Sequence, residues 1–399
     1  MIEAIQDARK VIKPHVIRTP MVLSPTISSL FDCECYLKLE NLQKTGSFKI
    51  RGAAYKLLKK GNGIGKEGVV AASAGNHAQG VALAARTRNI PATIIMPDWA
   101  SITKQEATKS YGGEVLIYGK TIEESLSKAN EIASSGKTLI HPFDDSDIIA
   151  GQGTVGLEIL EDIKEPDIVV VPIGGGGLIS GIAEAIKANH PLTKIIGVET
   201  AVCPSARESL IKRKPVVVQS GPSIADGISV KQIGGKNFDI VKNLVDDVVL
   251  VEEEQIAAAI LMLLEQKKIL AEGAGAVSLA AVMNKSIAIP KGAKVVLVIS
   301  GGNVDSSLLG RIINQGLSKH GRILRFQVTL TDTPGALATL LNLVAELKAN
   351  VLHIYHDRNV RDLPINITRV NLEVETRGQE HIDEILSAIE KAGYTIVQR

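Results

Sequence analysis

The sequence is poor in the residues that mark several classes of protein. Aromatic residues make up only 3% of it, so the stacking platforms that bind single-stranded nucleic acid are scarce. The formal net charge is +2, with acidic and basic residues interspersed, which leaves no basic footprint for nucleic acid. Three cysteines cannot make a disulfide framework, and Cys33-x-Cys35 is too closely spaced for a zinc knuckle. We therefore expect no nucleic-acid partner and no zinc site.

Long apolar runs and a leader segment are also missing. The longest apolar runs, such as Val295–Ile299, have the length of a strand and are far too short to span a membrane. The opening residues MIEAIQDARK lack the basic segment and following apolar segment of a secretory signal. We expect a soluble, cytoplasmic protein with no membrane contact.

Glycine and small apolar residues are abundant instead. The 36 glycines and 45% hydrophobic residues suit an α/β architecture with Val- and Ile-rich strands. Strand-like segments such as Val69–Ser73 alternate with helical patterns such as Val81–Arg88, which predicts βαβ units and a parallel sheet. The chain is too long for one ordinary core. We predict a two-lobed α/β domain over residues 1–320, with a smaller lobe at about 50–150.

The pattern changes at Arg322, after which strands and helices follow in the order βαββαβ. The expected elements are strands at Ile323–Leu330, Val351–His356, Ile367–Glu375 and Tyr394–Gln398, and helices at Ala336–Lys348 and Glu380–Ala392. This order is that of a ferredoxin-like unit. We predict a separate domain over residues 322–399.

The strongest local signal is the run Gly174–Gly177, between the apolar strand Ile168–Ile173 and a helix that starts at Leu178. Such a loop lets successive backbone N–H groups point at one anion, and the helix N-terminus adds partial positive charge. A phosphate group is the expected guest, and a flexible turn is the alternative. Gly151–Gly156 fits the dinucleotide fingerprint but follows a poor strand, and no glycine loop continues into Gly-Lys-Ser/Thr. A nicotinamide or ATP enzyme is not expected.

Two further turns follow predicted strands. Ser73–Gly80 carries Asn76 and could hold a carboxylate on its backbone N–H groups, although an ordinary turn is the better explanation of this stretch when taken alone. Ser300–Asn303 lies at the carboxyl end of a strand, where α/β sheets bind ligands. A lone serine there is usually a helix cap.

Lys49 stands between Phe48 and Ile50. Burial between apolar neighbours lowers the pKa of an ammonium group and yields the nucleophilic amine that forms a Schiff base with a carbonyl cofactor. A helix-start lysine whose head stays in water is the simpler interpretation of this stretch alone.

Taken together, the motifs resemble those of the threonine/serine dehydratases, which are fold-type II pyridoxal-phosphate enzymes related to the tryptophan synthase β chain. The motifs are Ser47–Ala53, Ser73–Gly80, Gly174–Leu178 and Ser300–Asn303. The resemblance covers roughly residues 1–320, and the last 75 or so residues resemble an ACT regulatory domain. It implies a two-lobed α/β fold-type II enzyme with a C-terminal βαββαβ ACT-like, ferredoxin-like domain.

The resemblance also implies roles for individual residues. Lys49 would bind pyridoxal 5′-phosphate as a Schiff base and then remove the Cα proton of the substrate. The other cofactor contacts would be Phe48, Asn76 at the 3′ oxygen, Ser300 at the pyridine nitrogen, and Gly174, Gly175, Gly176, Gly177 and Leu178 at the phosphate. The substrate carboxylate would be surrounded by Ser73, Ala74, Gly75 and His77.

The implied reaction is deamination by β-elimination. A serine opposite the pyridine nitrogen makes a weaker electron sink than an aspartate, which favours prompt loss of the β-hydroxyl. L-Threonine would give 2-oxobutanoate and ammonia, as the first step of isoleucine biosynthesis, and L-serine would give pyruvate. Ala74 replaces the serine of serine racemases, so efficient racemisation is not expected. Ser205 stands six residues after Glu199, where relatives carry an aspartate that binds a divalent cation, so we predict no such metal site.

The ACT-like domain would bind a feedback effector, isoleucine or valine, near Asp332, Gly335 and Asn350 in a homodimer or homotetramer. A dimerisation module without a ligand is the alternative. For the whole chain, the alternatives are another fold-type II enzyme (serine racemase, threonine synthase or cysteine synthase) or a non-catalytic amino-acid sensor.

Overall fold

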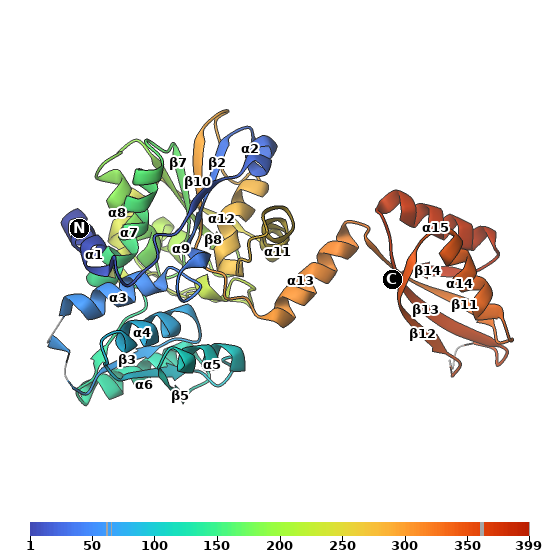
Figure 1. Cartoon of the computed structure of the whole chain (residues 1–399), viewed down its shortest axis with the longest axis horizontal. Coiled ribbons are helices and arrows are strands. Elements are labelled where there is room, and N and C mark those ends of the chain that lie inside the picture. Colours follow the sequence, from blue (N-terminus) through green and yellow to red (C-terminus); the bar gives the residue numbers. More distant parts are fainter. Residues whose placement is uncertain (61–62, 65, 360–362, 399) are drawn as a thin grey trace. The chain divides into compact units, whose positions relative to one another are not determined.

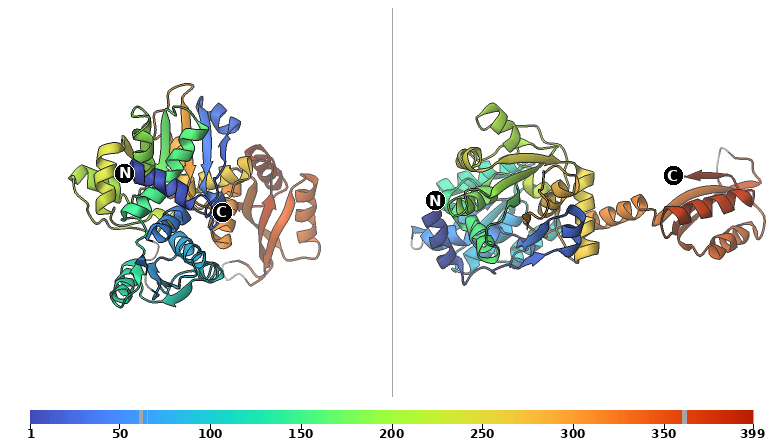
Figure 2. Two further views of the ribbon diagram at one scale, coloured as in Figure 1. Left: turned by 60° about the vertical axis from the view of Figure 1, so that its left-hand side comes forward. Right: turned by 90° about the horizontal axis from the view of Figure 1, so that it is seen from above.

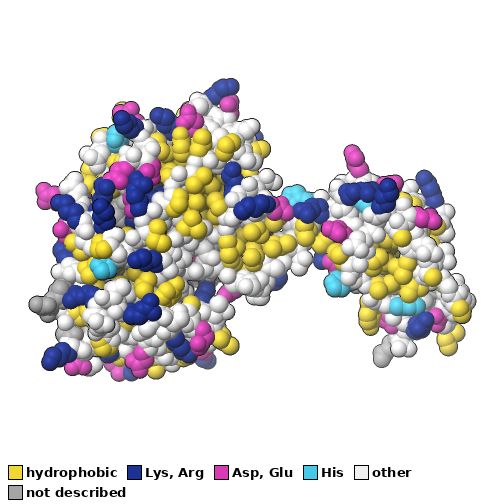
Figure 3. Space-filling view, viewed as in Figure 1, with side chains coloured by type: hydrophobic (Ala, Val, Ile, Leu, Met, Phe, Trp, Pro, Cys, Tyr) yellow, Lys and Arg dark blue, Asp and Glu magenta, His cyan; other side chains and the backbone are white. Residues whose placement is uncertain are grey.

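The computed structural model describes residues 1–60, 63–64, 66–359 and 363–398, and the chain divides into two compact units, residues 1–308 and 309–399 (Figure 1). Within the described ranges, no helix has both the length and the apolar character needed to cross a membrane. On the face shown in Figure 3, acidic and basic side chains are interspersed, as the small net charge predicts.

Unit 1 is built on a six-stranded sheet in the order β1-β2-β10-β7-β8-β9. The strands are β1 (Met21–Leu23), β2 (Glu34–Leu39), β7 (Ile168–Pro172), β8 (Lys194–Thr200), β9 (Asp247–Val251) and β10 (Lys294–Ile299). Only the pairing of β1 with β2 is antiparallel. Every residue of β7 is buried, because helices cover both faces of the sheet around it (Figure 1).

A second, smaller sheet in unit 1 is parallel throughout, in the order β5-β4-β3-β6. Its strands are β3 (Val69–Ala72), β4 (Ala92–Met96), β5 (Glu114–Ile117) and β6 (Thr138–Leu139), and its helices are α4 (Asn76–Arg86), α5 (Ile102–Ser110) and α6 (Ile122–Ser134). The remaining helices of unit 1 include α1 (Ile2–Ile12), α2 (Pro25–Phe31), α3 (Lys49–Lys60), α7 (Ser146–Asp162), α8 (Gly177–Lys187), α9 (Ser205–Lys212), α10 (Gly235–Leu244), α11 (Glu253–Met262) and α12 (Gly273–Met283). Two α/β sheets in one unit confirm the predicted two-lobed fold class.

The dinucleotide-like glycines lie inside helix α7, not in a turn after a strand. A Cβ at Gly151 would lie 2.6 Å from the Cα of Gly52 on α3, and one at Gly153 would lie 2.9 Å from the carbonyl oxygen of Gly181 on α8. The glycines therefore allow α7 to pack closely against two neighbouring helices, which explains the pattern without a nucleotide.

A buried ion-pair network fixes the first turn of α3. The Arg51 guanidinium bonds Glu40 at 2.7 Å and Glu158 at 2.7 Å, and Lys38 bonds Glu158 at 2.6 Å. The side chains of Arg51 and Glu40 are both fully buried. Together these contacts join the end of β2, the start of α3 and helix α7. Removing one partner would leave an uncompensated buried charge, which is strongly destabilising.

Unit 2 carries a four-stranded antiparallel sheet in the order β12-β13-β11-β14. After α13 (Ser306–Lys319), which contains the sequence boundary between the two units, come β11 (Ile323–Thr331), α14 (Ala336–Glu346), β12 (Asn350–Asp357), β13 (Ile367–Glu375), α15 (Gln379–Lys391) and β14 (Ile396–Gln398). Along β13 every second residue is buried, because α14 and α15 pack on one face of the sheet (Figure 2). The order confirms the predicted βαββαβ ferredoxin-like fold.

Candidate active site

The stretch that carries Lys49 lies against the turn that follows β10. Ser47 pairs with Gly301 in an isolated antiparallel bridge, and the Phe48 N–H donates to the Ser300 carbonyl oxygen at 3.1 Å. Lys49 then begins α3. Two of the predicted motifs, 250 residues apart in sequence, thereby form one wall of a common site at the carboxyl end of the large sheet.

The turn between β3 and α4 forms a second wall. Gly80 faces the start of α3, where an added Cβ would lie only 3.1 Å from the carbonyl carbon of Lys49. This close approach holds the turn beside Lys49. Asn76 joins the two walls, since its Nδ2 donates to Glu272 Oε1 at 2.6 Å and its Oδ1 accepts from Asn303 Nδ2 at 2.7 Å. The turn also contains the predicted carboxylate-binding residues Ser73, Ala74 and Gly75, and His77 follows in the first turn of α4.

The glycine run after β7 forms a cradle with no room for side chains. Gly176 has a φ of +93° and precedes α8 without a side-chain cap, so the first N–H groups of this helix are available to an anion. A Cβ at Gly175 would lie 2.2 Å from the ring of Phe143, and Asn237 Nδ2 donates to the carbonyl oxygens of Gly175 (2.9 Å) and Phe143 (3.1 Å). The segment around Phe143 links the cradle to Lys49, because Lys49 Nζ donates to the Pro142 carbonyl oxygen at 2.9 Å.

Lys49 is partly buried, and its environment shifts the ammonium toward the neutral amine. Burial lowers the pKa of the Lys49 ammonium to about 8, and the nearby Glu272 carboxylate raises it only in part. The ammonium also lies 5.3 Å from the centroid of the Phe48 ring. The structure therefore favours the desolvated lysine over the lysine in water, which was the simpler interpretation of the sequence.

Glu272 is a buried carboxyl group at the start of α12 that the sequence did not single out. Burial and, to a smaller extent, the Asp226 carboxylate raise its pKa, which lies at about 7. The Asn76 hydrogen bond and the positive charges of Lys104 and Lys49 act in the opposite direction. Glu272 and Lys49 are therefore two titratable groups of opposite sign whose pKa values are both shifted toward neutrality.

The side chains of His77 and Ser300 are engaged with backbone carbonyl groups. His77 Nε2 lies 2.9 Å from the Ile140 carbonyl oxygen, and burial lowers the pKa of His77 to about 3, so its ring is neutral. A role toward a substrate carboxylate would therefore fall to the backbone N–H. Ser300 Oγ donates to the Ala274 carbonyl oxygen at 3.2 Å and would have to rotate to donate to a cofactor nitrogen.

Comparison with known proteins assigns the family. Residues 12–301 match the family described as "Pyridoxal-phosphate dependent enzyme". The chain belongs to this family. It is 49% identical over 396 residues to an L-threonine ammonia-lyase of Thermotoga maritima, covering 99% of this chain and 98% of that protein. Among solved structures it is similar to threonine deaminase isoform 2 of Solanum lycopersicum (36% identity, 78% of this chain and 92% of that chain, TM-score 0.74) and to maize serine racemase (37%, 80% and 98%, TM-score 0.75).

The residues of this pyridoxal-phosphate enzyme fit its cofactor. Lys49 offers an amine of lowered pKa, and Gly174–Gly177 offers backbone N–H groups in a loop that packs too closely on its neighbours to accept a Cβ. Thr45 Oγ1 and Ser47 Oγ, on the stretch that leads to Lys49, are buried without a hydrogen-bond partner among the described residues. Such orphaned groups are costly unless a ligand or water satisfies them.

Several residues of the enzyme's site were not predicted from sequence. Four unpredicted residues contact the predicted ones: Glu272, Asn303, Phe143 and Asn237. Asn303 belongs to the Ser300 turn, whereas the other three lie in segments that carry no motif. The available signal for Glu272 was an acid directly before Gly273, at a helix start. Its partner Asn76 lies 196 residues away, so sequence spacing could not connect them.

The Glu199 carboxylate is occupied by protein donors. It accepts from the N–H groups of Ala206 (2.7 Å) and Arg207 (2.9 Å) and from Ser205 Oγ (3.4 Å), while burial raises its pKa to about 7. In the described ranges, no group of three or more His, Cys, Asp or Glu side chains is arranged to hold a metal ion.

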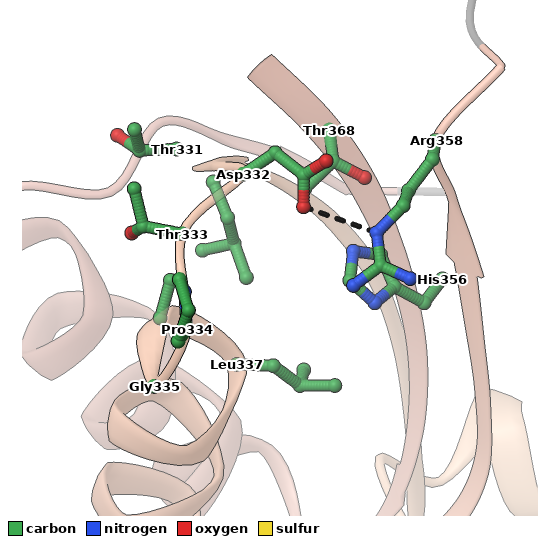
Figure 4. Close-up of a pocket in the computed structure, with 11 residues that line it drawn as sticks. Thr331, Asp332, Thr333, Pro334, Gly335, Leu337, His356, Arg358 and Thr368 are labelled. Carbon is green, nitrogen blue, oxygen red and sulfur yellow. Dashed lines mark hydrogen bonds and ion pairs between the residues drawn. The ribbon is translucent and has the colours of Figure 1, made fainter. Parts of the chain in front are cut away.

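Unit 2 of the enzyme contains a cavity of about 320 Å³ at the start of α14. Asp332 and Arg358 form an ion pair of 3.0 Å beside it, with His356 next to Arg358 (Figure 4). Two of the three predicted effector residues, Asp332 and Gly335, line this cavity, whereas Asn350 begins β12 at the other end from His356 and does not. His356 Nε2 is buried and has no partner among the described residues.

Proposed function

We propose that the chain is a threonine ammonia-lyase that converts L-threonine to 2-oxobutanoate and ammonia, and L-serine to pyruvate and ammonia. The observation that carries the proposal is the Lys49 amine, with its pKa lowered to about 8, at the meeting point of the Asn76 turn and the Ser300 turn. The names of the threonine ammonia-lyase and threonine deaminase relatives support this choice of substrate.

When bound, pyridoxal phosphate supplies an aldehyde for the substrate amino group and a conjugated ring that accepts the electron pair left by the Cα–H bond. Lys49 Nζ is the base that takes the Cα proton, because burial keeps part of its amine unprotonated near neutral pH. The backbone N–H groups of Asn76 and His77 at the start of α4 would bind the substrate carboxylate. The cradle Gly174–Gly177 and the first turn of α8 hold the phosphate.

The Lys49 ammonium, which carries the Cα proton after the first step, would donate it to the β-hydroxyl, so that the hydroxyl leaves as water. Hydrolysis of the released enamine then gives the oxoacid and ammonia. Racemisation needs a proton donor on the opposite face of Cα, and Ala74 has no side chain that could hold a proton there. Elimination is therefore the outcome that this site supports better than racemisation.

The test measures oxoacid production from L-threonine, L-serine, O-phosphohomoserine and O-acetylserine in parallel, together with the chirality of recovered serine. We expect 2-oxobutanoate from threonine, pyruvate from serine, and loss of both in Lys49→Ala. The control variant is Lys44→Ala, an exposed lysine on the same stretch, which should retain activity. Cofactor-loaded protein that yields no oxoacid from threonine would refute the proposal.

We also propose that the cavity in unit 2 binds isoleucine or valine as a feedback effector in a homodimeric or homotetrameric enzyme of isoleucine biosynthesis. Asp332 would pair with the effector ammonium, and Arg358 or the N–H groups that follow Gly335 with its carboxylate. Leu330 and Leu337 give the cavity an apolar side that suits a branched aliphatic side chain.

Threonine turnover with and without isoleucine or valine tests this regulatory proposal. Asp332→Asn should reduce the response to the effector while leaving basal turnover unchanged, because Asp332 lies in unit 2 and the catalytic Lys49 lies in unit 1. A response to isoleucine that is identical in wild type and Asp332→Asn would exclude this cavity as the effector site.

A further inference from the structure

We propose that Asn303 is a positioning residue: it fixes the orientation of the Asn76 side-chain amide, so that Asn76 turns its NH₂ group and not its carbonyl oxygen toward the cofactor. The inference rests on the proposed placement of pyridoxal phosphate beside Asn76. Asn303 closes the Ser300–Asn303 turn, in which only Ser300 had a predicted role.

The two asparagines belong to a continuous chain of hydrogen bonds. Asn303 Nδ2 donates to the Thr45 carbonyl oxygen at 2.8 Å and to Asn76 Oδ1 at 2.7 Å, with a longer contact of 3.4 Å to Gln79 Oε1. Asn76 Nδ2 in turn donates to Glu272 Oε1 at 2.6 Å. The chain therefore runs from a backbone carbonyl through two side-chain amides to a carboxyl group.

The direction of this chain is set by its first member. A backbone carbonyl can only accept, so Asn303 must present its NH₂ group to Thr45, and the same NH₂ group then faces Asn76. Asn76 must accept this hydrogen bond with its side-chain oxygen, and its NH₂ group therefore lies on the opposite side, where Glu272 lies. Reversing Asn303 alone would bring oxygen acceptors together, and reversing Asn76 alone would bring two NH₂ groups together. An amide nitrogen carries two protons, and Glu272 takes one of them.

The backbone around Asn303 is shaped to hold its side chain in place. Gly46 has a φ of +70°, and an added Cβ there would lie 2.3 Å from Asn303 Oδ1. The Gly302 N–H donates to the Gly46 carbonyl oxygen at 2.9 Å. The side chain of Asn303 thus fills the space that the side chain of any larger residue at position 46 would need. Gly46 lies three positions before Lys49. The same contact connects the orientation of Asn76 to the segment that carries the reactive lysine.

The experiment is a double-mutant cycle on the full-length protein, with the dissociation constant of pyridoxal phosphate as its main readout. Asn303→Asp keeps the shape of the side chain but removes both donors, so Asn76 loses the group that orients it. We expect Asn303→Asp and Asn76→Ala each to weaken cofactor binding by about tenfold, the order of one charge-assisted hydrogen bond. We expect the double variant to bind no more than about twofold more weakly than Asn76→Ala, because neighbours that act through one contact are not additive.

Asn41→Asp is the matched control, because Asn41 Nδ2 also donates to a backbone carbonyl, that of Leu270, without contacting Asn76. It should change cofactor affinity by less than about threefold. The midpoint pH of the bound cofactor's visible absorbance is a second readout, which should shift in Asn303→Asp and not in Asn41→Asp. If Asn303→Asp does not fold, Asn303→Ala enters the same cycle.

Losses that multiply in the double variant, or an unshifted absorbance midpoint in Asn303→Asp, would show that Asn303 acts independently of Asn76 and would overturn the inference. Neither readout requires turnover. A non-additive cycle in a protein that forms no oxoacid from threonine would refute the proposed function and leave the inference standing. An additive cycle in a protein that does turn over threonine would refute the inference and leave the proposed function standing.

Discussion

Replacing Lys49 by methionine should make the cofactor-free protein more stable at pH 7. Methionine has a similar length but no charge, so the variant removes the cost of burying an ammonium group. Burial lowers the Lys49 pKa from 10.5 to about 8, a shift of about 2.5 units that corresponds to about 3 kcal/mol at 1.36 kcal/mol per unit. The variant also loses the hydrogen bond to the Pro142 carbonyl oxygen, which contributes about 1 kcal/mol. We therefore expect a net gain of about 2 kcal/mol.

The gain should depend on pH in a defined direction. The folded-state pKa of Lys49 lies below its unfolded value, so the unfolded chain binds the proton more readily. The cost of burial is complete below pH 8, declines as the pH rises from 8 to 10.5, and is absent above that value. At pH 10.5 and above only the lost hydrogen bond remains, and Lys49→Met should then be slightly less stable than wild type.

Urea unfolding of cofactor-free wild type and Lys49→Met at a series of pH values measures both effects. Lys44→Met is the control, because Lys44 is an exposed lysine of the same stretch, and it should change the free energy of unfolding by less than about 0.5 kcal/mol. A stability difference between wild type and Lys49→Met that is the same at pH 7 and pH 10, or that favours wild type at pH 7, would refute the argument that Lys49 is desolvated.

Three further variants test other parts of unit 1. Arg51→Met should lose about 3–5 kcal/mol in urea unfolding, because two buried carboxylates lose their shared partner, and an unchanged midpoint would contradict the network's role. The free energy of unfolding of Glu272→Gln should rise relative to wild type by up to about 2 kcal/mol between pH 5 and pH 8, because the raised pKa of Glu272 makes its ionisation costly for the folded state. A difference in unfolding free energy that does not change with pH would contradict the raised pKa. Gly175→Ala places a methyl group 2.2 Å from the Phe143 ring and should weaken cofactor binding at least tenfold in a titration. The control Gly310→Ala, where a Cβ meets nothing within 4 Å, should bind the cofactor as wild type does.

The elements of the fold were predictable because they depend on local signals. The apolar strands, the glycine-rich turns after them and the βαββαβ order of the last elements can each be recognised within about ten residues. The role of Lys49 was different, since its own stretch favoured a lysine in water. Only the joint presence of Gly174–Gly177, Asn76 and Ser300 reversed that preference, and the structure brings the last two beside it.

The parts that sequence could not supply are contacts between distant segments. Asn303 and Asn76 are separated by 227 residues, and neither position predicts the direction in which the other's amide points. The neutral ring of His77 was equally inaccessible, because it depends on burial and on the Ile140 carbonyl oxygen. Side-chain orientation inside a site is decided by tertiary neighbours, whereas motifs report only which residue types are present.

Lys49 and Glu272, which influence each other's pKa, show what burial of both groups achieves. With their ordinary pKa values of 10.5 and 4.5, moving a proton from the lysine to the glutamate would cost about 8 kcal/mol. With pKa values of about 8 and about 7, the same transfer costs about 1.4 kcal/mol. Burial of both groups therefore brings the neutral pair much closer in free energy to the charged pair near neutral pH. A lysine whose amine must react with an aldehyde and later take a proton from carbon needs both its neutral and its protonated form to be accessible. The burial of Lys49, which lowers the stability of the fold, is also what makes both forms accessible.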